Sequence, residues 1–123
     1  MRKARTGLRM ALAFAGLLAA APAFAQEQKT VKEVPPVFDQ AFLTNKANIE
    51  IGRDVWQHQC RHCHGAAAYP GKAPKLDPGQ LEPGFIYERV TYGFGKMPSW
   101  KDVFTDTQRR GVVAYIKSDD FSP

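Results

Sequence analysis

Both cysteines and all three histidines of this chain lie in one short segment, "HQCRHCH", at residues 58–64. Two thiols stand three positions apart and an imidazole directly follows the second, as Cys60-Arg61-His62-Cys63-His64. Four kinds of site use cysteines at this spacing: a zinc site, a redox dithiol, a structural disulfide and a covalently attached haem. The fold has to leave this segment accessible to a metal or cofactor, because the chain has no other thiol or imidazole.

Three of these sites fit the sequence poorly. A structural zinc ion usually takes four protein ligands, with a second pair some distance along the chain, and no second pair exists here. A redox dithiol of the thioredoxin type follows a β-strand, whereas the residues before Cys60 have helical periodicity. A disulfide across two intervening residues closes too small a loop to stabilise much, and it leaves His64 without a role.

Covalent haem attachment accounts for both thiols and for the histidine. The thiols form thioethers with the two vinyl groups of the porphyrin, which places the following histidine beside the iron. We therefore predict one haem c bound through Cys60 and Cys63, with His64 as the proximal iron ligand. The haem would also supply apolar surface to a small domain that is rich in glycine, proline and charged residues.

The first residues predict export. A basic leader precedes an apolar run over residues 10–21, and Ala23 and Ala25 occupy the small-residue positions of a cleavage site. These are the parts of a secretory signal peptide, which we assign to residues 1–25, so that the mature chain begins at Gln26. An uncleaved anchor is the alternative, but the run is shorter than the roughly 20 residues of a membrane-spanning helix. We expect the protein in a bacterial periplasm.

Removing this leader changes the charge of the protein. The whole chain has 17 Lys and Arg against 12 Asp and Glu, and four of the basic residues lie within residues 1–25. The mature chain is therefore close to neutral, which argues against a nucleic-acid partner, since such proteins carry a strong basic excess.

Periodicity predicts an all-α domain with about three main helices, and the one covalent haem predicted above would lie among them. We expect an extended N-terminal arm at residues 26–46 and a domain at residues 47–123. One helix is expected around Asn48–Gln59 and a second at about Pro83–Tyr92, where proline suits the first position. The third begins with a capping box of Thr105 and Gln108. Its buried face is expected to hold Val112, Tyr115 and Ile116.

These features together resemble the small monohaem class I cytochromes c over about residues 48–118. That family has a glycine eight residues, and an aromatic residue four residues, before the first haem cysteine; this chain has Gly52 and Trp56 there. The resemblance implies that Gly52 lets the first helix cross closely over the last one, "GVVAYIK". Val112 and Tyr115 are the residues expected at this crossing.

The resemblance also implies a sixth iron ligand, Met97 in "GFGKMPSW", which is the only methionine outside the leader. The family carries its axial methionine in such a loop, although a lone methionine is also a common core residue. Only 33 positions separate His64 from Met97, which is short for this family and implies a more exposed haem edge.

Two further residues are expected beside the haem, Pro74 from the resemblance and Trp100 from the polar end of its side chain. Pro74 in "APKL" is expected to accept the ring N–H of His64 through its carbonyl, which would fix the tautomer of the imidazole. Pro70 and Pro78 are neighbouring alternatives. Trp100 and Tyr69 are both candidates to bond a haem propionate, and ordinary packing is the alternative for both.

With both axial positions filled, the expected function is single-electron transfer rather than enzymatic catalysis. The protein would be a periplasmic monomer that shuttles electrons between a dehydrogenase or membrane complex and an oxidase or reductase. A haem enzyme or gas sensor with an open distal site is the alternative. Four lysines are expected to ring the exposed haem edge and to steer an acidic partner: Lys72, Lys75, Lys96 and Lys101.

Overall fold

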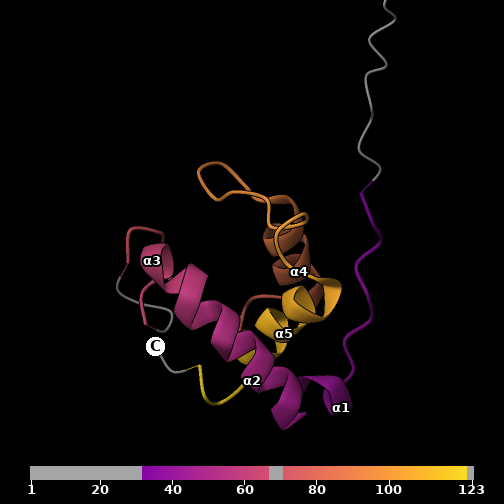
Figure 1. Cartoon of the computed structure of the whole chain (residues 1–123). Helices are drawn as coiled ribbons and strands as arrows, with labels where there is room; N and C mark the ends of the chain where they lie inside the picture. Colours follow the sequence, from indigo (N-terminus) through magenta and orange to yellow (C-terminus); the bar gives the residue numbers. More distant parts are fainter. Residues whose placement is uncertain (1–31, 67–70, 122–123) are drawn as a thin grey trace, which may run out of the picture. The chain divides into compact units, whose positions relative to one another are not determined.

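The structure is a computed structural model that describes residues 32–66 and 71–121. The expected signal peptide at residues 1–25, together with Tyr69 and Pro70, lies outside the described residues. Six helical elements follow one another in the described part (Figure 1): α1 (Gln40–Leu43), α2 (Lys46–Val55), η1 (Trp56–Cys60), α3 (Arg61–His64), α4 (Pro83–Tyr92) and α5 (Asp106–Ile116). The prediction of an all-α domain with three main helices is confirmed.

The expected N-terminal arm is not extended throughout. Its last third contains the helical turn α1, and α2 already begins at Lys46. The side chain of Asp39 accepts a hydrogen bond from the amide of Phe42 (2.7 Å), which caps this turn. The boundary between an arm and a domain at residues 46 and 47 stays a prediction.

The first main helix is longer than its apolar periodicity predicted. Elements α2, η1 and α3 follow without a gap from Lys46 to His64, and the side chain of Asn45 caps the start. In η1 the amide of Arg61 donates to the carbonyl of Trp56, five residues earlier, which makes this a π-helical turn. A π turn is wider than an α turn, so it rotates Cys60–His64 relative to the buried face of α2.

The two later helices begin where the sequence predicted, and α4 also ends there. Helix α4 begins at Pro83 and ends before Gly93, whose φ of 73° only glycine adopts easily. At the start of α5, the hydroxyl of Thr105 accepts from the amide of Gln108 (3.2 Å), and the Gln108 side chain accepts from the amide of Thr105 (3.0 Å). The capping box is therefore confirmed.

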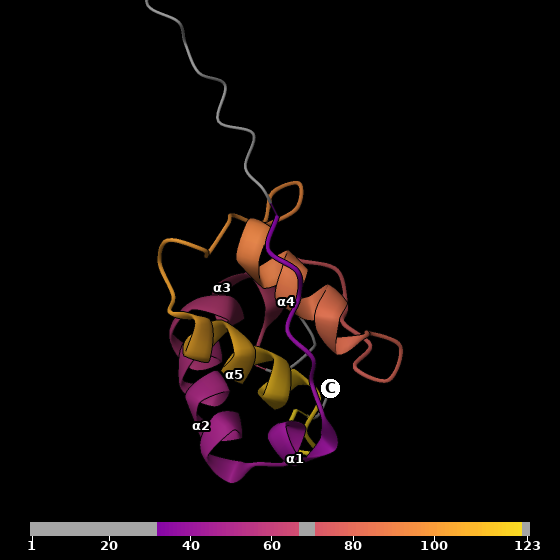
Figure 2. The same ribbon diagram turned by 90° about the vertical axis from the view of Figure 1, so that its right-hand side faces the viewer.

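Helix α2 packs against α5 at a close crossing (Figure 2). A Cβ built on Gly52 would lie 2.8 Å from Cβ of Tyr115 and still closer to the carbonyl of Gly111. Tyr115 is thus confirmed at the crossing, but the other contact is the backbone of Gly111 rather than Val112. Gly111 and Tyr115 are four residues apart and share one face of α5, whereas Val112 is turned into the core and is only 1% exposed.

An aromatic cluster fills the space beside this crossing. The ring centroid of Trp56 lies 4.7 Å from that of Phe121 and 6.1 Å from that of Tyr115. The predicted burial of Val112, Tyr115 and Ile116 in α5 is confirmed. Among the described residues, no helix is long and apolar enough to cross a membrane.

Candidate functional site

The two cysteines lie where η1 passes into α3, and both thiols are free. Cys60 is half-buried, and this burial raises the pKa of its thiol to about 12, while Cys63 is exposed. Reactive redox dithiols show the opposite shift, because the thiolate is the attacking species. The burial of Cys60 therefore disfavours a redox dithiol, and two free thiols lie one helical turn apart.

The imidazole of His64 is half-buried at the end of α3. Burial lowers its pKa, which favours the neutral ring that ligates metals. Its Nδ1 atom is buried and has no hydrogen-bond partner among the described residues. Buried polar atoms are rarely left unpaired, so this ring has one nitrogen free to ligate an iron or to donate its N–H to a backbone carbonyl while the other nitrogen ligates.

Trp56 holds the chain that follows His64. Its indole Nε1 donates to the carbonyls of Gly65 (3.1 Å) and Ala66 (3.2 Å), and its ring centroid lies 5.6 Å from that of His64. Gly65 ends α3 with φ at 84°. The aromatic residue that the resemblance singled out therefore contacts both the imidazole and the backbone beside it.

The segment that contains Pro74 returns to the motif. The amide of Ala73 donates to the carbonyl of Cys63 (2.8 Å), and a Cβ on Gly71 would lie 2.8 Å from the amide nitrogen of Gly65. Pro74 is exposed and makes no hydrogen bond with His64 in the described part of the chain. Its role as the partner of His64 stays a prediction, although the adjacent residue is bonded to the motif.

Met97 lies in a tight loop between α4 and α5, not on a helix. The amide of Phe94 donates to the carbonyl of Met97 (3.0 Å), and the amide of Met97 donates back to Phe94 (2.9 Å). Gly93 and Gly95 have positive φ values of 73° and 59°, which let the chain turn within these few residues. The side chain of Met97 is half-buried against the core.

This methionine loop, residues 93–101, is anchored on the last turn of α4. The hydroxyl of Ser99 and the amide of Lys101 both donate to the carbonyl of Thr91, at 2.7 and 3.1 Å. The ring of Trp100 stacks on Phe104, with centroids 5.0 Å apart. The packing alternative for Trp100 therefore has direct support, and its contact with a propionate stays a prediction.

The remaining histidines offer no second site. His58 and His62 are exposed, and each ring lies within hydrogen-bond distance of a backbone carbonyl of its own helix, at 2.8 and 3.0 Å. Among the described residues, no group of three or more His, Cys, Asp or Glu side chains is placed to hold a metal ion. This geometry gives a zinc site no support.

Sequence reasoning missed a polar network behind the methionine loop. The guanidinium of Arg109, only 6% exposed, donates to the hydroxyl of the fully buried Thr91 (3.2 Å) and lies 3.8 Å from a carboxylate oxygen of Glu33. A signal was present, because Arg109 precedes Val112 and Val113 by three and four residues and so shares a buried face of α5.

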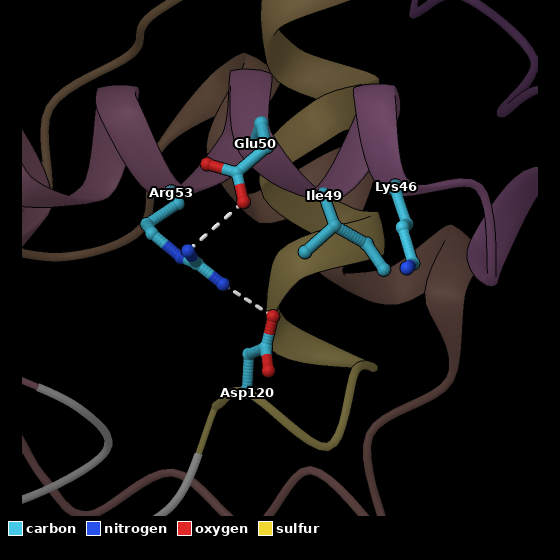
Figure 3. Close-up of a pocket in the computed structure, with 5 residues that line it drawn as sticks. All are labelled: Lys46, Ile49, Glu50, Arg53 and Asp120. Atoms are coloured by element: carbon cyan, nitrogen blue, oxygen red, sulfur yellow. Dashed lines mark hydrogen bonds and ion pairs between the residues drawn. The ribbon is translucent and has the colours of Figure 1, made fainter.

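A hollow on α2 lies away from the motif (Figure 3). Arg53 crosses it and pairs with Glu50 (2.9 Å) and with Asp120. Lys46 and Ile49 complete the lining. Its charged groups are largely paired and it contains neither thiol nor imidazole, so we assign the chemistry to Cys60–His64.

The residues at the motif fit a covalently attached haem. Two free thiols are available for thioethers, and a neutral imidazole with an unpaired buried nitrogen follows them directly. In comparisons with known proteins, residues 47–116 match the family model described as cytochrome c oxidase, cbb3-type, subunit III. A cytochrome c6 of Bryopsis maxima is 35% identical, over 56% of this chain and 89% of that protein.

Proposed function

The chain belongs to the cytochrome c family, and on this basis we propose that it carries single electrons in the periplasm with His64 and Met97 as axial ligands. As a cytochrome c it is an electron carrier rather than an enzyme, and Cys60 and Cys63 hold its haem c covalently. The bound haem supplies an iron that accepts and releases one electron.

The position of Met97 carries the proposal. It is the only methionine outside the leader, and it is half-buried in a loop whose backbone is bonded to itself and to α4. These bonds fix where the thioether lies, as a ligand to iron requires. A methionine opposite a histidine favours ferrous iron and raises the potential.

The other residues position and protect these ligands. Trp56 binds the backbone after His64 and limits how the imidazole can turn, and burial keeps that imidazole neutral. Ligation of the iron by both His64 and Met97 would leave no open site for a substrate or a gas. This supports a carrier over the alternative, a haem enzyme or gas sensor with a labile distal ligand.

Replacing Met97 with alanine is the direct test. We expect loss of the weak long-wavelength charge-transfer band of methionine-ligated ferric haem, because the thioether that produces it is gone. The potential should fall by on the order of a few tenths of a volt, within the ~0.8 V that axial ligands span. The measurements are the ferric spectrum, a redox titration and carbon monoxide binding to the reduced protein.

Val103→Ala is the matched control, since it removes an exposed aliphatic side chain shortly after the loop. It should keep the band, the potential and the resistance to carbon monoxide. An unchanged band in Met97→Ala would show that another group is the sixth ligand. A wild-type protein that binds carbon monoxide at once would instead favour the gas sensor or enzyme.

The partners and the compartment follow from the same proposal. The leader at residues 1–25 supports export to the periplasm, where a dehydrogenase or membrane complex would donate electrons. The matching family model is named for a subunit of a cbb3-type oxidase, which supports a terminal oxidase as acceptor. We propose a monomer, and the near-neutral mature chain gives no support to a nucleic-acid partner.

Of the four lysines expected to ring the haem edge, Lys101 has to be removed. Lys101 is half-buried, and its ammonium group pairs with Glu33 at 3.0 Å, so its charge is largely neutralised. Lys72, Lys75 and Lys96 are exposed. We propose that these three, and Lys96 beside Met97 above all, steer an acidic partner to the haem edge.

Lys96→Glu should slow electron transfer to an acidic partner about fivefold at low ionic strength, because local charge sets the association rate. The difference should shrink as salt is added and the Debye length falls to about 8 Å or less. Lys46→Glu is the control, since it makes the same charge change at the start of α2. Equal rate losses in both variants would mean that net charge, not a local patch, controls docking.

A further inference from the structure

The segment before α1 lies along α4 and α5 (Figure 2), and it precedes residues 47–116, which match the family model. Lys32 forms an ion pair with Glu88 of α4 at 2.8 Å. The amide of Glu33 donates to the hydroxyl of Tyr92, at the end of the same helix. The backbone of this segment is therefore held beside the helix from which the methionine loop departs.

The carboxylate of Glu33 contacts two cations that belong to different elements. One oxygen lies 3.0 Å from Nζ of Lys101, the last residue of the methionine loop, and the other lies 3.8 Å from Nη2 of Arg109 in α5. The hydrogen bond with Glu33 raises the pKa of Lys101. Lys101 also lies over the ring of Tyr92, 5.5 Å from its centroid.

Arg109 depends on this carboxylate because its own charge is buried. Its second acidic neighbour, Asp106, is also 3.8 Å away, but that residue additionally accepts from Tyr87 (2.6 Å) and lies 3.8 Å from Arg110. A buried cation that loses a partner is strongly disfavoured. Without Glu33, Arg109 would shift toward its other neighbours or toward water.

Such a shift would reach the methionine loop through Thr91. The side chain of Thr91 accepts from Arg109 (3.2 Å), and its carbonyl accepts from Ser99 and Lys101. Glu33 thus acts on the contact between Thr91 and the methionine loop by two routes, directly through Lys101 and indirectly through Arg109. Both routes end within a few residues of Met97.

We propose that Glu33 is a positioning residue for Met97, which clamps the C-terminal end of the methionine loop through Lys101 and Arg109. The inference rests on the proposed ligation of iron by Met97. Its consequence is that a segment outside the matched family region sets how firmly the sixth ligand is held. An exogenous nitrogen ligand should displace Met97 more easily when this clamp is removed.

The test uses the full haem-loaded protein and imidazole as the competing ligand. In Glu33→Gln, the imidazole concentration that removes half of the methionine charge-transfer band should fall about fivefold, the scale expected for an ion pair of this kind. Glu33→Asp should recover part of the loss. Lys101→Gln should show a similar fall, and the double variant should lose less than the two single effects combined.

Glu50→Gln is the matched control, because it removes a carboxylate that pairs with Arg53 on α2 instead. It should leave the imidazole titration unchanged. Amide hydrogen exchange provides a readout that needs no methionine ligand: Glu33→Gln should speed exchange at Trp100 and Lys101, but not in α2.

The outcomes separate the two proposals. In the first case the wild type shows the band and Met97→Ala loses it. If Glu33→Gln then behaves like Glu50→Gln in both measurements, the positioning role of Glu33 is wrong and ligation by Met97 stands. If the wild type lacks the band, Met97 is not the ligand and both proposals fail. Faster amide hydrogen exchange in Glu33→Gln would in that case show only that Glu33 holds the methionine loop.

Discussion

Changing Cys60 and Cys63 together to serine is expected to abolish covalent haem and to leave a chain that does not unfold cooperatively. Serine has nearly the same size as cysteine but cannot form a thioether, so the change acts through the cofactor. Several apolar side chains of the domain are only partly buried: Leu76, Leu81, Met97, Trp100 and Phe104. Without the apolar surface of the haem, the core left to so short a chain is marginal.

Haem staining of denaturing gels measures the covalent link in the purified protein, and circular dichroism during guanidinium titration measures folding. His62→Ala is the control, since this exposed residue lies inside the motif without being a thiol or the histidine that we propose as the proximal ligand. It should retain covalent haem and a cooperative transition. Recovery of a double serine variant that is stably folded without haem would contradict the dependence of the fold on its cofactor.

Gly52→Ala is expected to destabilise the haem-loaded protein by about 3 kcal/mol or more, the range reached when a core is overpacked or its backbone is displaced. The added Cβ would meet the backbone of Gly111 and lie 2.8 Å from Cβ of Tyr115. Neither neighbour is the end of a flexible side chain, so α2 and α5 would have to separate. The measurement is the free energy of unfolding in guanidinium.

Gly84→Ala makes the same chemical change in α4 and should have the opposite sign. A Cβ there would find its nearest neighbour, the Cβ of Pro35, at an ordinary 3.6 Å. Alanine is favoured over glycine in a helix by roughly 0.5–1 kcal/mol, so the variant should be slightly more stable than the wild type. Two variants of equal stability would mean that the crossing at Gly52 is looser than described.

The structural elements that the sequence predicted well are those whose signals are local. Pro83 and Gly93 bound α4 because one suits the first helical position and the other ends the helix with a positive φ. Thr105 and Gln108 satisfy each other's backbone amides within one turn. The first helix was predicted too short at both ends, because Lys46 and the mostly polar residues of Arg61–His64 add little to the apolar periodicity on which the prediction rested.

The family and the mode of haem attachment were determined by the sequence alone. Cys60, Cys63 and His64 lie within five residues, and their spacing along the chain is enough to predict covalent haem attachment. The tertiary structure decided which residues of different helices and loops contact one another. It placed Gly111 rather than Val112 against Gly52, and it paired Lys101 with Glu33, 68 positions away, instead of leaving it free for a partner. Such contacts depend on how helices cross and on which face of each is buried, and no local pattern of residues specifies that geometry.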